Sequence, residues 1–262
     1  MKPVALITGA SAGIGTELAR VFAAHGHELV LMARREDRLA ALADEIAAAG
    51  RPRPTVLGID LGRRDATSRI AAELAARGLE PNFVVNNAGF GLTGAAAALD
   101  RDEQLAMIDL NIRTLTELSL AFVHSLARHR GGILNVASTA AFLPGPGMAV
   151  YYASKAYVLS FTEALHQELK RRGVRVTALC PGPVLTEFQA RAGLKLTGLF
   201  RLLPLVSAER VAQIGYRGLM RGRRAVIPGP INRFAAAVAR FSPHAMLNVM
   251  TDQSRRLPTG RT

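Results

Sequence analysis

The sequence predicts an α/β fold in a single domain, with a doubly wound parallel sheet covered by helices on both faces. Three observations predict it. Short apolar runs alternate with longer amphipathic stretches over the first 180 residues, a glycine-rich turn follows the first run, and neither a fixed-period repeat nor a Pro/Gly/Ser-rich linker divides the 262 residues. Strands that alternate with helices of this length are typical of βαβ units, whose strands are parallel.

Each apolar run is a predicted strand and each amphipathic stretch a predicted helix. The helix at 35–49 illustrates the pattern, because Leu39, Leu42 and Ile46 follow helical spacing and Gly50 is suited to a helix end. Within the domain of residues 1–262 we expect an apolar, irregular substrate flap at about 185–206 and a basic C-terminal extension at about 230–262. The predicted strands are 4–8, 28–33, 55–59, 83–86, 132–137, 174–179 and 225–228, and the predicted helices are 14–25, 35–49, 65–77, 102–128 and 151–172.

The composition excludes several classes of protein. Hydrophobic residues make up 49% of the chain and charged residues 20%, which excludes a mostly disordered protein. Cys180 is the one cysteine, so neither an intrachain disulfide nor a cysteine-based zinc cluster can form, and we expect it to be a small buried residue. The six histidines lack metal-ligand spacing, and we predict no metal site.

The amino terminus does not predict a signal peptide, because its apolar run is short and enters the glycine-rich turn. No stretch of 18 or more residues is uncharged and consistently apolar, so we predict no membrane-spanning helix. These features favour a cytoplasmic protein.

The net charge of +13 is concentrated in the last third of the chain. Residues 1–170 contain 17 Lys+Arg and 17 Asp+Glu, whereas residues 171–262 contain 16 Lys+Arg and 3 Asp+Glu. Such asymmetry suits an anionic membrane surface, an acidic partner or nucleic acid, and it is equally consistent with a solvated surface that has no partner. Trp is absent and no nucleic-acid-binding motif is present, so we predict no nucleic-acid partner.

The first strand–helix turn reads Thr8-Gly9-Ala10-Ser11-Ala12-Gly13-Ile14-Gly15. Glycines let a backbone approach a pyrophosphate closely, and the helix that follows directs free N–H groups at the phosphates. The spacing G-x-x-x-G-x-G differs from the G-x-G-x-x-G fingerprint, but its position after the first strand predicts a Rossmann-like dinucleotide site.

The tip of the second predicted strand indicates which dinucleotide binds. It reads Ala33-Arg34-Arg35, without a carboxylate. A carboxylate there binds the ribose hydroxyl of NAD, whereas arginine accommodates the 2′-phosphate of NADP. The sequence therefore predicts NADP(H), with Arg34 as the leading contact and Arg35 and Ser11 beside it. For Arg35, a solvated surface charge is an equally good interpretation.

Tyr151 and Lys155 are four residues apart on a predicted helix, which places them on one face, roughly 6 Å apart along the axis. A nearby ammonium group favours the phenolate, so such a pair beside a nicotinamide can serve as an acid/base for carbonyl–alcohol chemistry. Taken alone, this spacing is more often a helix surface pair. Tyr152 lies three residues from Lys155 and could pair by spacing alone.

The motifs gain weight because they occur together and in order. TGASAGIG at 8–15, NNAG at 86–89, Asn111, Ser138, YYASK at 151–155 and Pro181-Gly182 resemble the short-chain dehydrogenase/reductase family over about residues 3–190. The resemblance implies an NADP(H)-dependent oxidoreductase that forms homodimers or homotetramers. Its implied catalytic residues are Asn111, Ser138, Tyr151 and Lys155.

The family assigns each of these residues a role. Tyr151 would protonate a carbonyl oxygen, Ser138 would orient that carbonyl, and Lys155 would lower the pKa of Tyr151 and bind the nicotinamide ribose. Asn111 would hold a water behind Lys155, Asp60 would contact the adenine, and Tyr152 would pack against a neighbour. The residues expected at the cofactor are Gly9, Ser11, Gly13, Ile14, Gly15, Arg34, Arg35, Asp60, Asn87, Ala88, Gly89, Tyr151, Lys155, Pro181, Gly182, Val184 and Thr186.

The flap and the C-terminal extension carry the remaining expectations. Leu194, Leu199 and Phe200 belong to a strongly apolar flap, which suits a lipophilic carbonyl or alcohol substrate unless these residues only complete the core. In the extension, Ile231, Phe234, Val238 and Phe241 form an apolar stripe beside arginines. Such a helix can lie on an anionic membrane, pack on its own domain or contact a second subunit.

The leading interpretation is thus a carbonyl reductase, or the reverse alcohol dehydrogenase. Two alternatives stay open: a 3-oxoacyl-thioester reductase whose basic surface docks an acidic carrier protein, and a non-catalytic NADP-binding regulatory protein. A non-catalytic protein has no need of all four catalytic residues, so their joint presence argues against this second alternative. A weak contact with an anionic membrane or an acidic carrier protein, and hence peripheral membrane localisation, is a further expectation from the charge.

Overall fold

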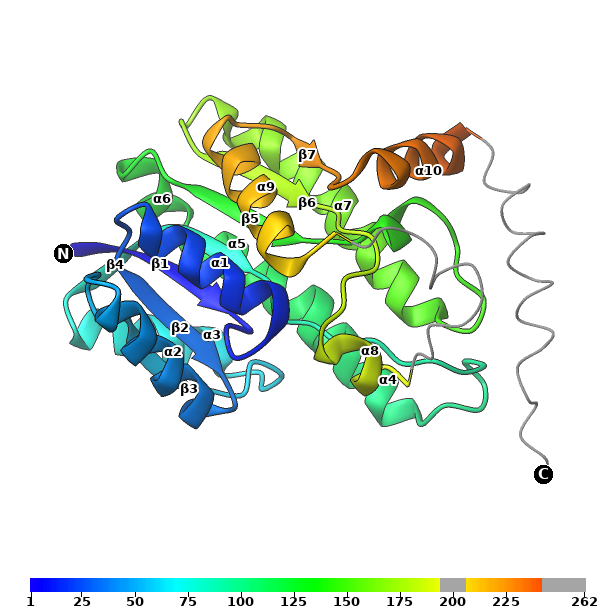
Figure 1. Ribbon diagram of the computed structural model, residues 1–262, viewed down its shortest axis with the longest axis horizontal. Helices are drawn as coiled ribbons and strands as arrows, with labels where there is room; N and C mark the ends of the chain where they lie inside the picture. Colours follow the sequence, from blue (N-terminus) through cyan, green and yellow to red (C-terminus); the bar gives the residue numbers. More distant parts are fainter. Residues whose placement is uncertain (194–205, 242–262) are drawn as a thin grey trace.

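The computed structural model describes residues 1–193 and 206–241, and these form a seven-stranded sheet in the order β3-β2-β1-β4-β5-β6-β7 (Figure 1). Every neighbouring pair of strands is parallel, which confirms the predicted doubly wound fold. Because β1 pairs with both β2 and β4, the winding reverses there, and ligands of such sheets bind at the carboxyl ends beside that point. The strands are β1 (Lys2–Thr8), β2 (Leu29–Ala33), β3 (Thr55–Gly58), β4 (Leu79–Asn86), β5 (Gly132–Val136), β6 (Arg175–Leu179) and β7 (Ala225–Val226).

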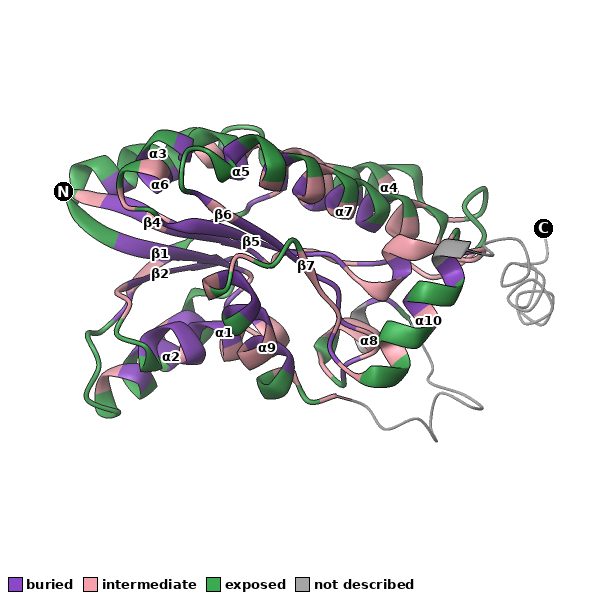
Figure 2. Cartoon of the chain, turned by 90° about the horizontal axis from the view of Figure 1, so that it is seen from above, coloured by how far each residue is buried: buried purple, intermediate pink, exposed green. Residues whose placement is uncertain are grey.

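Helices cover both faces of the sheet (Figure 2). One layer contains α1 (Gly13–Ala24), α2 (Glu36–Ala48) and α9 (Ala208–Met220). The other contains α3 (Ala66–Ala76), α4 (Arg101–Ile108), α5 (Leu115–Ala121), α6 (Val123–Arg128) and α7 (Ala149–Lys170). Side chains of β1 alternate between the layers: Ala5 and Ile7 join the core under α1, whereas Val4 and Leu6 join the opposite core. A strand buried on both faces needs an unbroken apolar run, which is the signal that predicted it.

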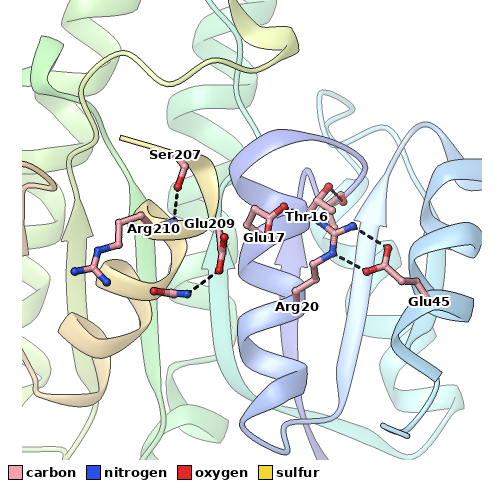
Figure 3. A network of polar contacts seen from close by, with 9 residues as sticks. Thr16, Glu17, Arg20, Glu45, Ser207, Glu209 and Arg210 are labelled. Carbon is pink, nitrogen blue, oxygen red and sulfur yellow. Dashed lines mark hydrogen bonds and ion pairs between the residues drawn. The ribbon is translucent and has the colours of Figure 1, made fainter. Parts of the chain in front are cut away.

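Polar contacts fix the layer of α1 and α2 (Figure 3). Arg20 of α1 donates from Nε and Nη2 to the two carboxylate oxygens of Glu45 in α2, at 2.7 and 2.8 Å, and from Nη1 to Glu17 at 2.6 Å. The side-chain hydrogen bond from Arg20 lowers the pKa of Glu45. At the start of α9, the Ser207 hydroxyl accepts from Arg210 N at 3.2 Å and caps the helix.

The predicted helix 102–128 is wrong as a single element. The structure breaks it into α4, a π-helix η1 (Asp109–Thr114), α5 and α6, with Phe122 between the last two. A π-turn adds one residue per turn, a change that apolar periodicity does not reveal. Helix α9 was not predicted, although Val211, Gly215 and Leu219 are buried at four-residue spacing.

Two further helices lie in the predicted flap and in the predicted C-terminal extension. The short α8 (Glu187–Arg191) falls in the predicted flap, whose apolar residues 194–205 lie outside the described residues. In the extension, α10 (Pro230–Phe241) buries Ala236 and Ala239, while Ile231, Phe234 and Val238 are exposed. The described part of the apolar stripe therefore faces away from its own domain, and what covers it stays open. Residues 242–262 of the extension are not described.

Candidate active site

All the predicted site residues except Gly15 and Asn111 line a single cavity of about 1770 Å³. The cavity lies at the carboxyl ends of the strands, because Gly9 follows β1, Arg34 follows β2, Asn87 follows β4 and Pro181 follows β6. Parallel strands thus bring to one place residues that are far apart in the sequence.

The glycine-rich turn lies close to neighbouring backbone. Gly9 and Gly13 have positive φ angles of 66° and 58°, a region that residues with a Cβ atom rarely adopt. A Cβ on Gly15 would lie 2.2 Å from the carbonyl oxygen of Gly9, so Gly15 allows α1 to approach the turn rather than lining the cavity. Asn87 braces the turn, since its Nδ2 donates to the carbonyl oxygens of Thr8 at 2.9 Å and Gly9 at 3.2 Å.

The tip of β2 provides two arginines with different surroundings. Arg34 lines the cavity, is exposed, and has no hydrogen-bond or ion-pair partner among the described residues. Arg35 also lines the cavity and donates from Nη2 to the Ser11 hydroxyl at 3.3 Å. The two residues predicted to bind the 2′-phosphate beside Arg34 are therefore in contact with each other. Its Nη1 donates to Glu187 of α8 at 2.8 Å, a contact between residues far apart in the sequence.

At the other end of the cavity lie Ser138, Tyr151 and Lys155. Lys155 is buried, its Nζ donates to the carbonyl oxygen of Val136 at 2.9 Å, and Nζ lies 5.8 Å from the centroid of the Tyr151 ring. Burial lowers the pKa of Lys155 to about 8, partly offset by the nearby Cys180 thiol. At pH 7 the amine is therefore still mostly protonated.

Tyr151 does not have the lowered pKa expected from its pairing with Lys155. Burial raises the pKa of Tyr151 to about 12, and a hydrogen bond with Ser138 offsets the shift only in part. In the protein without its cofactor, loss of solvation thus outweighs the hydrogen bond from Ser138, which favours the phenolate. The neutral phenol is the form that can donate a proton at neutral pH.

Asn111 lies in η1, behind the cavity wall. Its Nδ2 donates to the carbonyl oxygen of Phe90 at 3.0 Å and to the Ser154 hydroxyl at 3.1 Å, and its Oδ1 accepts from Phe90 N at 3.2 Å. A Cβ on Gly89 would lie 2.9 Å from Asn111 Oδ1 and 3.5 Å from Lys155 Nζ, so the two side chains meet at Gly89. The water expected behind Lys155 stays a prediction.

The sequence matches a family model described as short chain dehydrogenase over residues 3–197. The chain belongs to the short-chain dehydrogenase family. It is 38% identical over 221 residues to sulfoacetaldehyde reductase 2 of Chromohalobacter salexigens, which covers 82% of this chain and 87% of that protein. The family membership makes it an oxidoreductase.

Two solved structures of dehydrogenases resemble it along their whole length. A short-chain dehydrogenase from Sphingobium yanoikuyae in complex with NADPH has a TM-score of 0.79 and 29% identity, and the match covers 99% of this chain and 98% of that one. The bulky-bulky ketone specific alcohol dehydrogenase from Comamonas testosteroni has a TM-score of 0.75 and 25% identity, and the match covers 100% and 97%.

The cofactor of this dehydrogenase is NADP(H), and its residues fit that group. The glycine-rich turn leaves no room for side chains, as the pyrophosphate requires. Arg34 is free among the described residues to bind the 2′-phosphate, and no carboxylate occupies the tip of β2. Asp60 also lines the cavity, and its Oδ1 accepts from Gly62 N at 3.0 Å.

The part of the dehydrogenase cavity beyond Tyr151 is largely apolar. A Cβ on Gly91 would lie 3.0–3.2 Å from Phe188, Met148 and Tyr151, so these three side chains converge there. Tyr152 packs against a neighbour as predicted, because a Cβ on Gly145 would lie 2.3 Å from its ring, and it also lines the cavity. The remaining residues at this end include Phe90, Leu92, Thr93 and Pro146.

Sequence reasoning missed several residues of this site. Arg63 and Met148 line the cavity without having been predicted, and Glu187, inside the predicted flap, had no expected role at the cofactor. Phe188, in the same flap, was expected to face the substrate, and it lines the cavity. Nothing in the local sequence distinguishes Arg63, Met148 and Glu187, because each reaches the cavity only through the tertiary fold. Within residues 1–193 and 206–241, no group of three His, Cys, Asp or Glu side chains could hold a metal ion, and no helix is long and apolar enough to cross a membrane.

Proposed function

We propose that the protein is an NADP(H)-dependent carbonyl reductase, or the reverse alcohol dehydrogenase, for uncharged lipophilic substrates. The observation that carries this proposal is the lining of the cavity beyond Tyr151. Phe90, Leu92, Met148 and Phe188 provide apolar surface there. Such a surface favours a substrate with apolar groups around its carbonyl, because burying those groups releases water.

The charges around the cavity oppose an anionic substrate. Among the described lining residues, the arginines are Arg34, Arg35 and Arg63, all near the tips of β2 and β3, and the remaining cation is Lys155. Glu103 of α4 also lines the cavity and would repel an anion. A buried sulfonate or carboxylate without a cationic partner would pay a large desolvation penalty. Sulfoacetaldehyde, which gives the curated relative its name, therefore fits the described part of the cavity lining poorly.

Each catalytic side chain has a role in this proposal. NADPH, when bound, supplies the hydride for the carbonyl carbon. Tyr151, held neutral by burial, donates its proton to the carbonyl oxygen, and Ser138 hydrogen-bonds and orients that oxygen. Lys155 binds the ribose and, being cationic at pH 7, stabilises the phenolate left behind. Asn111 holds a water behind Lys155, through which a proton can pass to the lysine.

We also propose that the enzyme acts as a homodimer or homotetramer. Leu105 and Ile108 of α4, Leu120 of α5 and Tyr157 of α7 are exposed, and these helices lie in one layer. Large apolar side chains on one surface are typical of a contact between subunits. Analytical sedimentation of the purified protein measures its oligomeric state.

A substrate panel tests the proposed reaction. With NADPH and the purified enzyme, we expect kcat/KM for an aromatic or bulky aliphatic ketone to exceed that for sulfoacetaldehyde by about 100-fold or more, since an unpaired buried charge costs about 3 kcal/mol or more. Oxidation of the reduced cofactor is followed by its absorbance. A higher kcat/KM for sulfoacetaldehyde would contradict the proposal.

The same panel separates the two alternatives. A 3-oxoacyl thioester that is reduced faster than any free ketone would favour a reductase of carrier-bound acyl chains. Binding of NADP⁺ without turnover of any carbonyl or alcohol would favour a regulatory protein.

A further inference from the structure

Three consecutive residues of α8 and the segment before it contact three different parts of the cofactor cavity. We call residues 184–189 the strap. Thr186 packs on the glycine-rich turn, with its Cγ2 3.0 Å from the position of a Cβ on Gly13. The ring centroid of Phe188 lies 5.4 Å from that of Tyr151. Between them, Glu187 contacts the first residues of α2, so the strap joins both ends of the cavity.

Glu187 binds two arginines at once. Its Oε2 accepts from Arg35 Nη1 at 2.8 Å, and its Oε1 accepts from Arg38 Nη1 at 2.5 Å. Arg35 also donates from Nη2 to the Ser11 hydroxyl, so both terminal nitrogens of its guanidinium group are engaged. A carboxylate presents paired oxygens to the guanidinium fork in the same way as a phosphate does. Glu187 therefore occupies a donor that a 2′-phosphate would use.

Electrostatic repulsion also opposes the binding of a 2′-phosphate beside Glu187. Arg34, Arg35 and Arg38 supply three positive charges at the start of α2. Glu187 adds a third carboxylate to the two of the first turn, Glu36 and Asp37. A bound 2′-phosphate would bring about 1.5 to 2 further negative charges at neutral pH. Two anions on the same guanidinium group repel each other, and that repulsion weakens the binding of both.

We propose that Glu187 competes with the 2′-phosphate of NADP(H) for Arg35 and thereby limits the preference of the enzyme for NADP(H) over NAD(H). The phosphate binds Arg34 without competition and binds Arg35 only when the Glu187 carboxylate leaves it. NAD(H) has a hydroxyl at this position and leaves the ion pairs of Glu187 intact. This inference concerns the cofactor and does not depend on which carbonyl is reduced.

The experiment compares Glu187→Gln with a matched control, Glu45→Gln. Glu45 is bound by Arg20 through both carboxylate oxygens, and the side chains of Glu45 and Glu187 are each 54% exposed. Dissociation constants for NADP⁺ and NAD⁺ are measured by titration with the intact proteins. We expect the ratio of Kd for NAD⁺ to Kd for NADP⁺ to rise about two- to fivefold in E187Q, the size that exposed ion pairs produce, and to stay unchanged in E45Q.

An unchanged ratio in E187Q would overturn the proposal. A lower ratio would overturn it as well, because it would show that Glu187 holds Arg35 in place for the phosphate. Arg34→Ser checks the assay, since losing the uncontested arginine must weaken NADP⁺ binding. Thermal melts of each variant establish that it is folded.

A second measurement examines the strap directly. Without cofactor, amide hydrogen exchange over residues 184–189 is expected to be faster in E187Q than in the wild type or E45Q, because the carboxylate no longer ties the strap to α2. Equal exchange in all three proteins would contradict the role of the ion pairs. Neither readout involves turnover, so failure of the proposed ketone reduction would leave both results interpretable.

Discussion

Buried charged side chains differ between the two edges of the sheet: the one at the carboxyl edge has no ion pair among the described residues, and the one at the amino edge has two partners. At the carboxyl edge, Lys155 is buried with no ion pair among the described residues, and its Nζ donates to a backbone carbonyl. At the amino edge, Glu80 near the start of β4 is also buried, but it accepts from Arg128 at 2.5 Å and from His129 at 2.9 Å. Burying a charge without a partner costs stability, so proteins retain it where chemistry requires it. The contrast separates a site from a structural network.

The distribution of arginine sharpens this comparison. Arg130, Arg175, Arg223 and Arg224 lie at or just before the starts of β5, β6 and β7, whereas the cavity lies at the opposite ends of these strands. An anionic lipid surface or an acidic carrier protein held by these four arginines would therefore lie at the edge of the sheet opposite the cavity. The predicted contact with such a partner stays a prediction, and Arg201, Arg255 and Arg256 lie outside the described residues.

The largest effect is expected at the carboxyl edge. Tyr151→Phe removes the proposed proton donor and keeps the ring, so kcat should fall by about 10²–10⁴-fold or more while NADPH binding changes little. Tyr152→Phe is the matched control, because the neighbouring ring lines the same cavity and should lose far less activity. Steady-state kinetics with the best ketone measures both. Equal activity of the two variants would assign the acid to another residue.

An intermediate effect is expected at the amino edge, on stability rather than activity. Glu80→Gln keeps the shape and weakens the bonds to Arg128 and His129, so the free energy of unfolding should fall by about 1–3 kcal/mol, with kcat unchanged. Glu73→Gln, in an exposed pair with Arg77, should change it by less than about 0.5 kcal/mol. Denaturant unfolding measures both variants. A loss of activity in E80Q without a loss of stability would break the contrast between the edges.

The Glu80 comparison also has a predicted pH dependence. The hydrogen bond from His129 is the main cause that lowers the pKa of Glu80 below 4.5 in the folded protein. Folding then favours the ionised carboxylate, so its contribution is complete above the unfolded pKa and is lost as the pH falls through the folded one. The difference in unfolding free energy between the wild type and E80Q should therefore shrink below about pH 4.5.

The smallest expected effect concerns the pH dependence of stability and comes from His27, in the loop before β2. Its Nε2 lies 3.0 Å from the Tyr216 hydroxyl, and its ring packs on Phe22 and Phe83. Burial lowers the pKa of His27 below 6.5, and the neighbouring charges of His25 and Arg175 lower it further. The folded protein resists protonation there, so stability is complete above about pH 6.5 and decreases as the pH falls towards the folded pKa.

His27→Phe tests this dependence, because it removes the titrating ring from the aromatic cluster. The slope of the unfolding free energy against pH should become shallower below pH 6.5 than in the wild type. Urea titrations at several pH values measure it, and an unaltered slope in the His27 variant would contradict the prediction.

The sequence alone determined the fold class and most of the candidate site. Strands buried on both faces, such as β1, need unbroken apolar runs, and the turn at Gly9 and Gly13 needs residues that accept positive φ angles. Both requirements are local and therefore visible in the residues themselves. Arg34 could be identified from its place at a strand end, whereas Tyr151 and Lys155 needed the resemblance to the family, because their spacing alone is more often a helix surface pair.

The tertiary structure decided what depends on distant neighbours. Glu187 meets Arg35 only because α8 folds back over the start of α2, across 152 positions of sequence. The π-helix at Asn111 depends on contacts with Phe90 and Ser154, which no periodicity encodes. The raised pKa of Tyr151 follows from burial, a property of the whole packed cavity that the spacing from Lys155 does not reveal. Solvation and long-range ion pairs exist only once the chain has folded, and here they set the protonation and the charge of the site.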